Sequence, residues 1–261
     1  MNVTGSIDLG TGSLSGASGT TFDIAGGTVS TTYSGNISQG NNGALVSVAG
    51  HTTGTLLFQT GVLSSTNGNG LIFDNADGTY NFTGKLTLDG GSNGITVQDG
   101  SSGTFSFTSA TSSIGATTTP TGLAFSVDGS NANVTYNGTI QQTHAAAVVS
   151  VTNETGGTVA LGGAITANTS TANAINLTGN SGATINFTGG LNLTTTSGTG
   201  FNATGGGTVN ATQNNTLDRQ YHLQHHGDGV EHRQHHHWCE RRHLPQYFRH
   251  GFERQRRHRA R

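Results

Sequence analysis

Six acidic residues in the first part of the chain are candidates for acid–base chemistry. Hydrolysis of a glycosidic bond needs a pair of carboxyl groups facing each other across that bond. Three of the six follow an apolar doublet at similar places in successive segments, so we expect these three along one edge of the fold: Asp74, Asp99 and Asp128. Aspartate is also favoured in turns, and the DG and DN corners explain the acids without catalysis. The corner interpretation is preferred, and no catalytic residue is predicted. The six acids are Asp74, Asp77, Asp89, Asp99, Asp128 and Glu154.

Basic residues are almost absent from the same part of the chain. Cleaving an acidic sugar polymer requires cations that neutralise its carboxylates, together with a base that takes a proton. Lys85 is the only Lys or Arg before Arg219. The sequence therefore predicts a protein that is not an enzyme, and a carbohydrate-active enzyme of the pectate-lyase-like β-helix class remains the alternative.

Metal-binding patterns are equally weak before position 217. His51 and His144 are the only histidines there, far apart in sequence, and both are expected to be polar surface residues. The calcium-binding nonapeptide G-G-x-G-x-D is not repeated; LDGGSNG and VQDGSSG are single imperfect echoes of it. No metal or cofactor is predicted, although weak calcium binding at the aspartate-rich corners stays open.

The elements that position these residues are best seen in residues 174–193, AINLTGNSGATINFTGGLNL. Apolar and small polar residues alternate there in three short runs separated by glycine-rich corners. Strict alternation places the apolar side chains on one face of each strand and Asn or Thr on the other. Runs this short are not stable alone, so the stretch predicts one turn of a stack of similar turns.

The same unit recurs along the chain. An apolar doublet appears after Gly43, Gly70, Gly94 and Gly122, and again at Ala147, Ala174 and Gly200, with spacings of 27, 24, 28, 25, 27 and 26 residues. A period of this length with three short strands predicts an all-β fold, a right-handed parallel β-helix (β-solenoid) of about eight coils between residues 19 and 216.

Details of the predicted solenoid follow from its period. Outward Thr and Asn should form polar ladders, although no regular T-x-T column is visible, and glycine should occupy corners where backbones approach closely. Pro120 lies in the longest spacing and is expected in a loop bulging from one corner. The terminal coils should expose unpaired strand edges.

The composition changes at about Leu217, so residues 1–216 are predicted as the repeat region and 217–261 as a disordered tail. The formal charge is −7 before this point and +5 after it, because all ten arginines lie in the tail. One interpretation is a metal site, but its candidate ligands lack a paired spacing: His235, His236, His237, Cys239 and His243. A second is a basic nucleic-acid or lipid contact around Arg254–Arg257.

The favoured interpretation of the tail is translation out of frame. Codons for His, Gln and Asp have A in the middle position and codons for Arg have G. A one-base shift makes these the first letters of Thr, Asn, Ile, Ala and Gly codons, which restores the composition and the period of the repeat. The alternate frame of the gene should then continue the repeat without stop codons.

Neither a secretory signal nor an apolar membrane-spanning run is visible, so an exported protein would contain this chain as an internal fragment. The units INLTGNSGATINFTGGLNLTTTSGTGFNATGGGTVNAT resemble the repeats of bacterial autotransporter passengers and filamentous-haemagglutinin-like adhesins. The resemblance implies a non-catalytic structural or adhesive segment at the bacterial cell surface, exported through a separate translocator domain in the outer membrane.

The partners implied by this resemblance are glycans or proteins on host or neighbouring cells, together with the adjoining coils of a longer protein. Neither nucleic acid nor membrane insertion is expected of residues 1–216.

Overall fold

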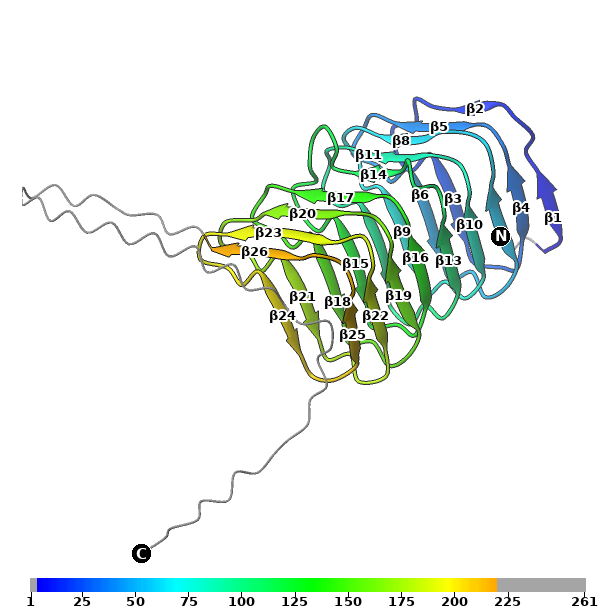
Figure 1. The fold of residues 1–261 in the computed structure, drawn as a ribbon. Helices are drawn as coiled ribbons and strands as arrows, with labels where there is room; N and C mark the ends of the chain where they lie inside the picture. Colours follow the sequence, from blue (N-terminus) through cyan, green and yellow to red (C-terminus); the bar gives the residue numbers. More distant parts are fainter. Residues whose placement is uncertain (1–3, 220–261) are drawn as a thin grey trace, which may run out of the picture.

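A computed structural model describes residues 4–219, which form a parallel β-solenoid without any helix in this range. The chain winds from sheet A to sheet B to sheet C and then returns to sheet A one layer further along (Figure 1). All strand pairings within residues 4–219 are parallel, and each strand pairs with the strand three positions earlier or later in the chain. The predicted fold class is therefore confirmed.

The three sheets contain nine, nine and eight strands. Sheet A consists of β1 Ser6–Asp8, β4 Ser30–Tyr33, β7 Thr55–Phe58, β10 Thr79–Phe82, β13 Thr104–Phe107, β16 Asn133–Tyr136, β19 Thr158–Leu161, β22 Thr184–Phe187 and β25 Thr208–Ala211. Sheet B consists of β2 Ser13–Leu14, β5 Asn36–Gln39, β8 Leu63–Ser65, β11 Leu86–Leu88, β14 Ser113–Ile114, β17 Thr139–Gln142, β20 Ile165–Asn168, β23 Leu191–Thr195 and β26 Thr216–Arg219. Sheet C consists of β3 Phe22–Ala25, β6 Val46–Ala49, β9 Leu71–Asp74, β12 Ile95–Gln98, β15 Phe125–Asp128, β18 Val149–Thr152, β21 Ile175–Thr178 and β24 Phe201–Thr204.

The solenoid has about nine turns, one more than predicted. The additional strands at the beginning are β1 and β2, which lie before residue 19 and pair with β4 and β5. Both strands are short and largely exposed. Their sequence therefore shows little alternation of apolar and polar residues, which is why they were not predicted. At the other end, β26 pairs with β23 and carries regular structure across the predicted boundary at 216/217 to Arg219.

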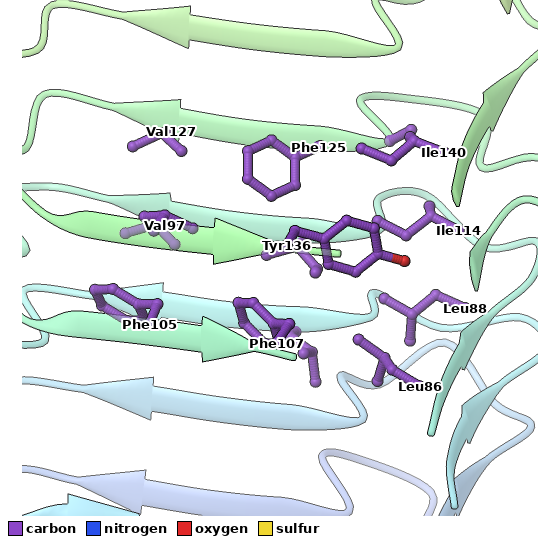
Figure 2. Packing of buried hydrophobic residues seen from close by; sticks show 14 of the residues in the cluster. Leu86, Leu88, Val97, Phe105, Phe107, Ile114, Phe125, Val127, Tyr136 and Ile140 are labelled. Atoms are coloured by element: carbon purple, nitrogen blue, oxygen red, sulfur yellow. The ribbon is translucent and has the colours of Figure 1, made fainter. Parts of the chain in front are cut away.

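One continuous core runs along the axis, because alternate residues of all three sheets point inward. Aromatic rings stack from turn to turn in sheet A: the Phe58 and Phe82 rings are 4.6 Å apart, and those of Phe82 and Phe107 are 4.7 Å apart. Figure 2 shows Phe105, Phe107 and Tyr136 between the aliphatic side chains of the other two sheets. Each stacked pair adds about 0.5–1.5 kcal/mol beyond the burial of its area.

Glycines at the corners between sheets A and B allow the backbones of successive turns to come into direct contact. A Cβ atom placed on Gly163 would collide with the carbonyl oxygen of Gly138 one turn below, and one on Gly61 would collide with that of Gly35. The expectation that a side chain would be in the way at these corners is confirmed. The outward Asn ladder is also present, since the Asn210 amide donates to Asn186 Oδ1 at 2.8 Å.

The longest turn lies around Pro120, as predicted. Hydrogen bonds between neighbouring turns join residues 30 positions apart there, against 24 for Ser130 and Glu154, 25 for Ala76 and Ser101 and 26 for Leu86 and Ser112. The loop between β14 and β15 exposes Thr117 and Thr118 but buries Thr119 and Pro120. The extra residues are thus only partly a surface bulge; the proline itself is buried.

Candidate functional site

Each turn leaves sheet C through a residue in the left-handed backbone region. The non-glycine examples are Asn75, Asp99 and Asn153, with φ of 48°, 52° and 57°. Only Gly, Asn and Asp adopt this conformation readily. The N–H of each residue in this column donates to the carbonyl of the last strand residue one turn above, as Asn153 does to Thr178 at 2.8 Å. The corner interpretation therefore describes Asp99 well.

Two of the predicted acids share an edge of sheet C. Asp74 and Asp128 lie in one column, with Gln98 between them in register. The Gln98 amide donates to Asp74 Oδ2 at 3.3 Å and to Asp99 Oδ2 at 2.8 Å, and Asp99 lies one residue later, at the corner. The expected edge is confirmed for Asp74 and Asp128, which are two strands and about 10 Å apart, whereas Gln98 takes the place expected for Asp99.

The remaining predicted aspartates lie at other corners. Asp77 Oδ1 accepts hydrogen bonds from the backbone and hydroxyl of Ser102, at 3.0 and 2.7 Å. Asp89 Oδ1 accepts one from the backbone of Thr117 at 3.0 Å. Both contacts tie a corner to the following turn, so these two carboxylates have local structural partners.

Glu154 differs from the other acids because it is fully buried, at 0% exposure. Its carboxyl oxygens accept hydrogen bonds from the backbone N–H and the hydroxyl of Ser130. Burial raises the pKa of Glu154; the Ser130 hydrogen bonds lower it, and the charge of Asp128 raises it further. We expected all six acids to occupy corners, because Asp is favoured in turns. This expectation is wrong for Glu154, whose side chain is buried in the interior.

His51 was expected at the surface, and the structure contradicts this. The ring is 0% exposed, with Nε2 2.8 Å from the Val29 carbonyl oxygen and Nδ1 2.9 Å from the Tyr80 hydroxyl. A carbonyl only accepts, so Nε2 carries a proton, and in the tautomer with its proton on Nε2 alone the Nδ1 atom accepts a hydrogen bond from the Tyr80 hydroxyl. Burial also raises the pKa of Tyr80 to about 12, opposed by a hydrogen bond from Gly78. Corner geometry explains the difference: His51 directly follows the left-handed Gly50, and the equivalent residue after Asn153 is the buried Glu154.

His144 and Lys85 are both exposed, as expected for His144. His144 Nδ1 lies 2.9 Å from the hydroxyl of Thr119 in the long loop. Lys85 borders a small hollow with no room for a water molecule, and the other lining residues are mostly apolar: Phe58, Leu63, Phe82, Gly84 and Leu86. No acid lines this hollow, so the structure does not bring Lys85 into an acid–base pair there.

The outer face of sheet C holds a feature that the sequence analysis did not single out. Ser126 in β15 and Ser150 in β18 are in register and point outward, because their neighbours Phe125 and Val127 lie in the core. Nevertheless they are only 5% and 7% exposed. By contrast, the outward side chains of sheets A and B whose exposure is described are all at least partly exposed.

A sequence signal for these serines exists in hindsight. FSVDGS at 125–130 and VSVTNE at 149–154 are equivalent segments of adjacent turns. Alternation places Ser126 and Ser150 outward. It does not reveal that both are buried, or that Ser130 and Glu154 meet in the interior.

The candidate metal ligands of the tail, the basic run Arg254–Arg257 and the frame-shift interpretation all lie outside the described residues; these candidate ligands are His235, His236, His237, Cys239 and His243. Within residues 4–219, no group of three or more His, Cys, Asp or Glu side chains is placed to hold a metal ion. No helix in that range is long and apolar enough to cross a membrane. Comparison with protein-family models, with curated proteins and with solved structures found no match.

Proposed function

We propose that this chain is a structural and adhesive segment, without catalytic activity, of a bacterial protein that is secreted or displayed at the cell surface. The observation that carries the proposal is a column of neutral polar side chains that runs unbroken along the outside of sheet A. One outward column of sheet A consists of Ser6, Ser30, Thr55, Thr79, Thr104, Asn133, Thr158, Thr184 and Thr208.

Such a column supports adhesion through repetition. Its hydroxyl groups recur at about 4.8 Å from turn to turn, so a partner with a repeating surface can form many weak contacts at once. The column two residues further along is mixed, with Leu57, Asn81 and Ala160 among its members, so paired threonine columns are absent from sheet A, as expected. The absence of charge from this column also permits in-register stacking, since like charges in neighbouring strands repel.

The partners in this proposal are glycans or proteins on host or neighbouring cells. The test is binding of the full chain, coupled to beads, to epithelial and bacterial cells, alongside turnover assays with pectate, glucans and chitin. Saturable binding without turnover is the expected result. Turnover of any of these polysaccharides would overturn the proposal in favour of an enzyme, and binding no greater than that of beads carrying albumin would remove the adhesive part.

Location is tested separately. An antibody against residues 4–219 should label intact cells of the source bacterium, or detect the protein in the culture supernatant. Signal only after lysis would contradict display and secretion.

A further inference from the structure

We propose that the corner joining the turns of β15 and β18 is a pH-sensitive clasp, which is closed while Glu154 is protonated and opens when this side chain ionises. The corner lies near the middle of the solenoid, where β15 and β18 are neighbours in sheet C (Figure 1). The inference concerns a conformational change within the solenoid and is independent of the proposed adhesive function.

Two carboxyl groups join the same pair of turns, one from each turn. On the outside, Asp128 at the end of β15 reaches the next turn, and its Oδ1 accepts hydrogen bonds from Thr152 Oγ1 at 2.6 Å and from Asn153 Nδ2 at 3.0 Å. On the inside, Glu154 of the next turn reaches back to Ser130, whose backbone N–H and hydroxyl both donate to it. We call these contacts the corner clasp. The two turns are thus held together on both sides of the backbone.

Equivalent corners use uncharged acceptors for the same inner contact. The N–H of Ala76 donates to Ser101 Oγ at 3.0 Å, and the N–H of Glu154 itself donates to Asn180 Oδ1 at 3.1 Å. Donor and acceptor are in each case the buried residues that follow the left-handed corners of successive turns. The Ser130 contact differs because its acceptor is a carboxyl group, so closure there depends on protonation.

Ionised Glu154 has too few partners in the closed corner. A carboxylate can accept about four hydrogen bonds. The fully buried Glu154 has two donors among the described residues, both from Ser130. The sequence between Lys85 and Arg219 contains neither Lys nor Arg, so no cation from that stretch compensates the charge. Because an uncompensated buried charge is costly, opening the corner to water becomes favourable once the proton has left for the solvent. A protonated carboxyl both donates and accepts, so it keeps its contact with Ser130 without a charge.

Asp128 is the titratable group that faces Glu154 from the neighbouring turn. Burial raises the pKa of Glu154 most, the Ser130 hydrogen bonds lower it, and the charge of Asp128 raises it further. The turn above contributes the uncharged Asn180. Strands β16 and β19, which follow the two corners, contain Tyr136 as their sole titratable residue, and its hydroxyl donates to a carbonyl beyond the far end of β16. The closed corner therefore opposes ionisation of Glu154 by burial and by one like charge.

Gly129 provides a hinge for the opening. Its φ of 63° lies in the left-handed region, and a Cβ atom placed on it would meet no atom within 4 Å. At the equivalent Gly179, an added Cβ would lie 3.1 Å from Asn153 Oδ1. Glycine adopts a wide range of backbone angles, so the segment that carries Ser130 can move outward without displacing a packed neighbour. The strands below stay joined through the apolar core, in which Figure 2 shows Phe125 and Val127 of β15.

The test is hydrogen exchange of single amides of the full chain between pH 4 and pH 8, followed by ¹⁵N NMR and corrected for the intrinsic pH dependence of exchange. The reporters are the N–H groups of Ser130 and of Thr155, which donates to the Ser130 carbonyl at 3.0 Å. Their protection should fall by about tenfold per pH unit above the ordinary carboxyl pKa of about 4.3, and it should level off above the folded pKa of Glu154. The Ala76 N–H, bonded to the hydroxyl of Ser101, is the internal control and should keep its protection.

Three variants identify the titrating group. Glu154→Gln keeps an oxygen for the Ser130 N–H but cannot ionise, so its reporters should be as protected at pH 8 as at pH 4. Asp128→Asn removes the charge that faces Glu154, so the protection of the reporters should level off at a lower pH than in the parent chain. Asp77→Asn is the matched control, because Asp77 is a corner acid that bonds Ser102 in another pair of turns, and it should leave the profile unchanged.

The proposal is overturned if the protection of Ser130 and Thr155 follows that of Ala76 at every pH, or if Glu154→Gln retains the pH dependence of the parent chain. Equal loss of protection at a distant core amide, such as that of Ile185 in β22, would also overturn it, because the opening would then be global unfolding. Should Glu154→Gln fail to fold, Asp128→Asn decides: a profile shifted to lower pH supports the clasp, and an unchanged profile contradicts it.

Discussion

Ser130 donates two hydrogen bonds to the carboxyl group of Glu154 in the following turn, from its backbone N–H at 3.0 Å and from its hydroxyl at 2.6 Å. Both residues are buried directly after the corner that follows sheet C. The only basic side chain before Arg219 is that of Lys85, so no cation in that part of the chain compensates Glu154. Two hydrogen bonds replace only part of the hydration that an ionised carboxylate loses on burial.

The first prediction is that Glu154 makes the fold less stable as the pH rises. Its pKa is raised in the folded state, so the folded chain retains a proton that the unfolded chain has lost. Stability contributed by the protonated form is then fully present below the ordinary carboxyl pKa of about 4.3 and is lost as the pH rises through the folded pKa. Glu154→Gln removes this dependence. Its melting temperature should exceed that of the parent chain at pH 7, and the difference should shrink towards pH 4.

The control for Glu154 is Asp77→Asn, an exchange of the same kind at a partly exposed acid that accepts two hydrogen bonds from Ser102. It should not raise the melting temperature at pH 7. If Glu154→Gln destabilises the chain equally at pH 4 and pH 7, the carboxylate is compensated by something other than Ser130, and the prediction is wrong.

The second prediction concerns the left-handed column. Asn75 has a φ of 48°, and its side chain is exposed. A β-branched residue there should cost about 1–2 kcal/mol, because its Cβ branches crowd the backbone in this conformation. Asn75→Val should therefore lower the unfolding free energy in urea by that amount, whereas Asn75→Gly should change it by a few tenths at most. Thr104→Val, on the outward column of sheet A, provides a β-branched control without a left-handed backbone and should be nearly neutral. Equal effects of Val at positions 75 and 104 would contradict the conformational cause.

The period and the strand alternation could be predicted from the sequence because they are set by many residues at once. Inward and outward positions within strands, such as Ile175 and Asn176, follow from alternation alone. The corners could not be assigned in this way. Whether a residue after the corner points inward depends on one left-handed φ, so His51 and Glu154 were assigned to the surface or the corner although both are buried.

Recognition of the candidate site was limited by the same physics. Outward alternation identifies Ser126 and Ser150 as surface residues, but both are buried, and the burial of an outward side chain depends on its surroundings rather than on the alternation of its own strand. The first strands, β1 and β2, were missed for the opposite reason, since strands of three and two residues carry too little alternation to detect.

The third prediction tests the close approach of turns at the glycine corners. A methyl group on Gly163 would meet the backbone oxygen of Gly138, which cannot move without displacing a turn. Gly163→Ala should destabilise the chain by about 1–3 kcal/mol, as forced overpacking does elsewhere. Gly156→Ala is a matched control, because the nearest atom to its added Cβ would be the Asn131 Cβ at 3.4 Å. Urea unfolding of both variants decides the matter, and a Gly163 variant as stable as the Gly156 variant would show that the corners yield more easily than the geometry implies.

The fourth prediction compares two buried tyrosine hydroxyls. The Tyr80 hydroxyl is shared by His51 Nδ1 at 2.9 Å and by the backbone N–H of Gly78 at 3.1 Å, whereas the Tyr136 hydroxyl has one partner, the Thr139 carbonyl, at 3.3 Å. Tyr80→Phe leaves two buried polar groups unpaired and should cost about 1–3 kcal/mol, and Tyr136→Phe should cost about 1 kcal/mol or less. His51→Leu in the Tyr80→Phe background completes a double-mutant cycle: because each partner is left unpaired by loss of the other, the two costs should not add. Additive costs in that cycle would mean that the His51 ring gains nothing from the tyrosine hydroxyl, and that its burial depends on the bond to Val29 alone.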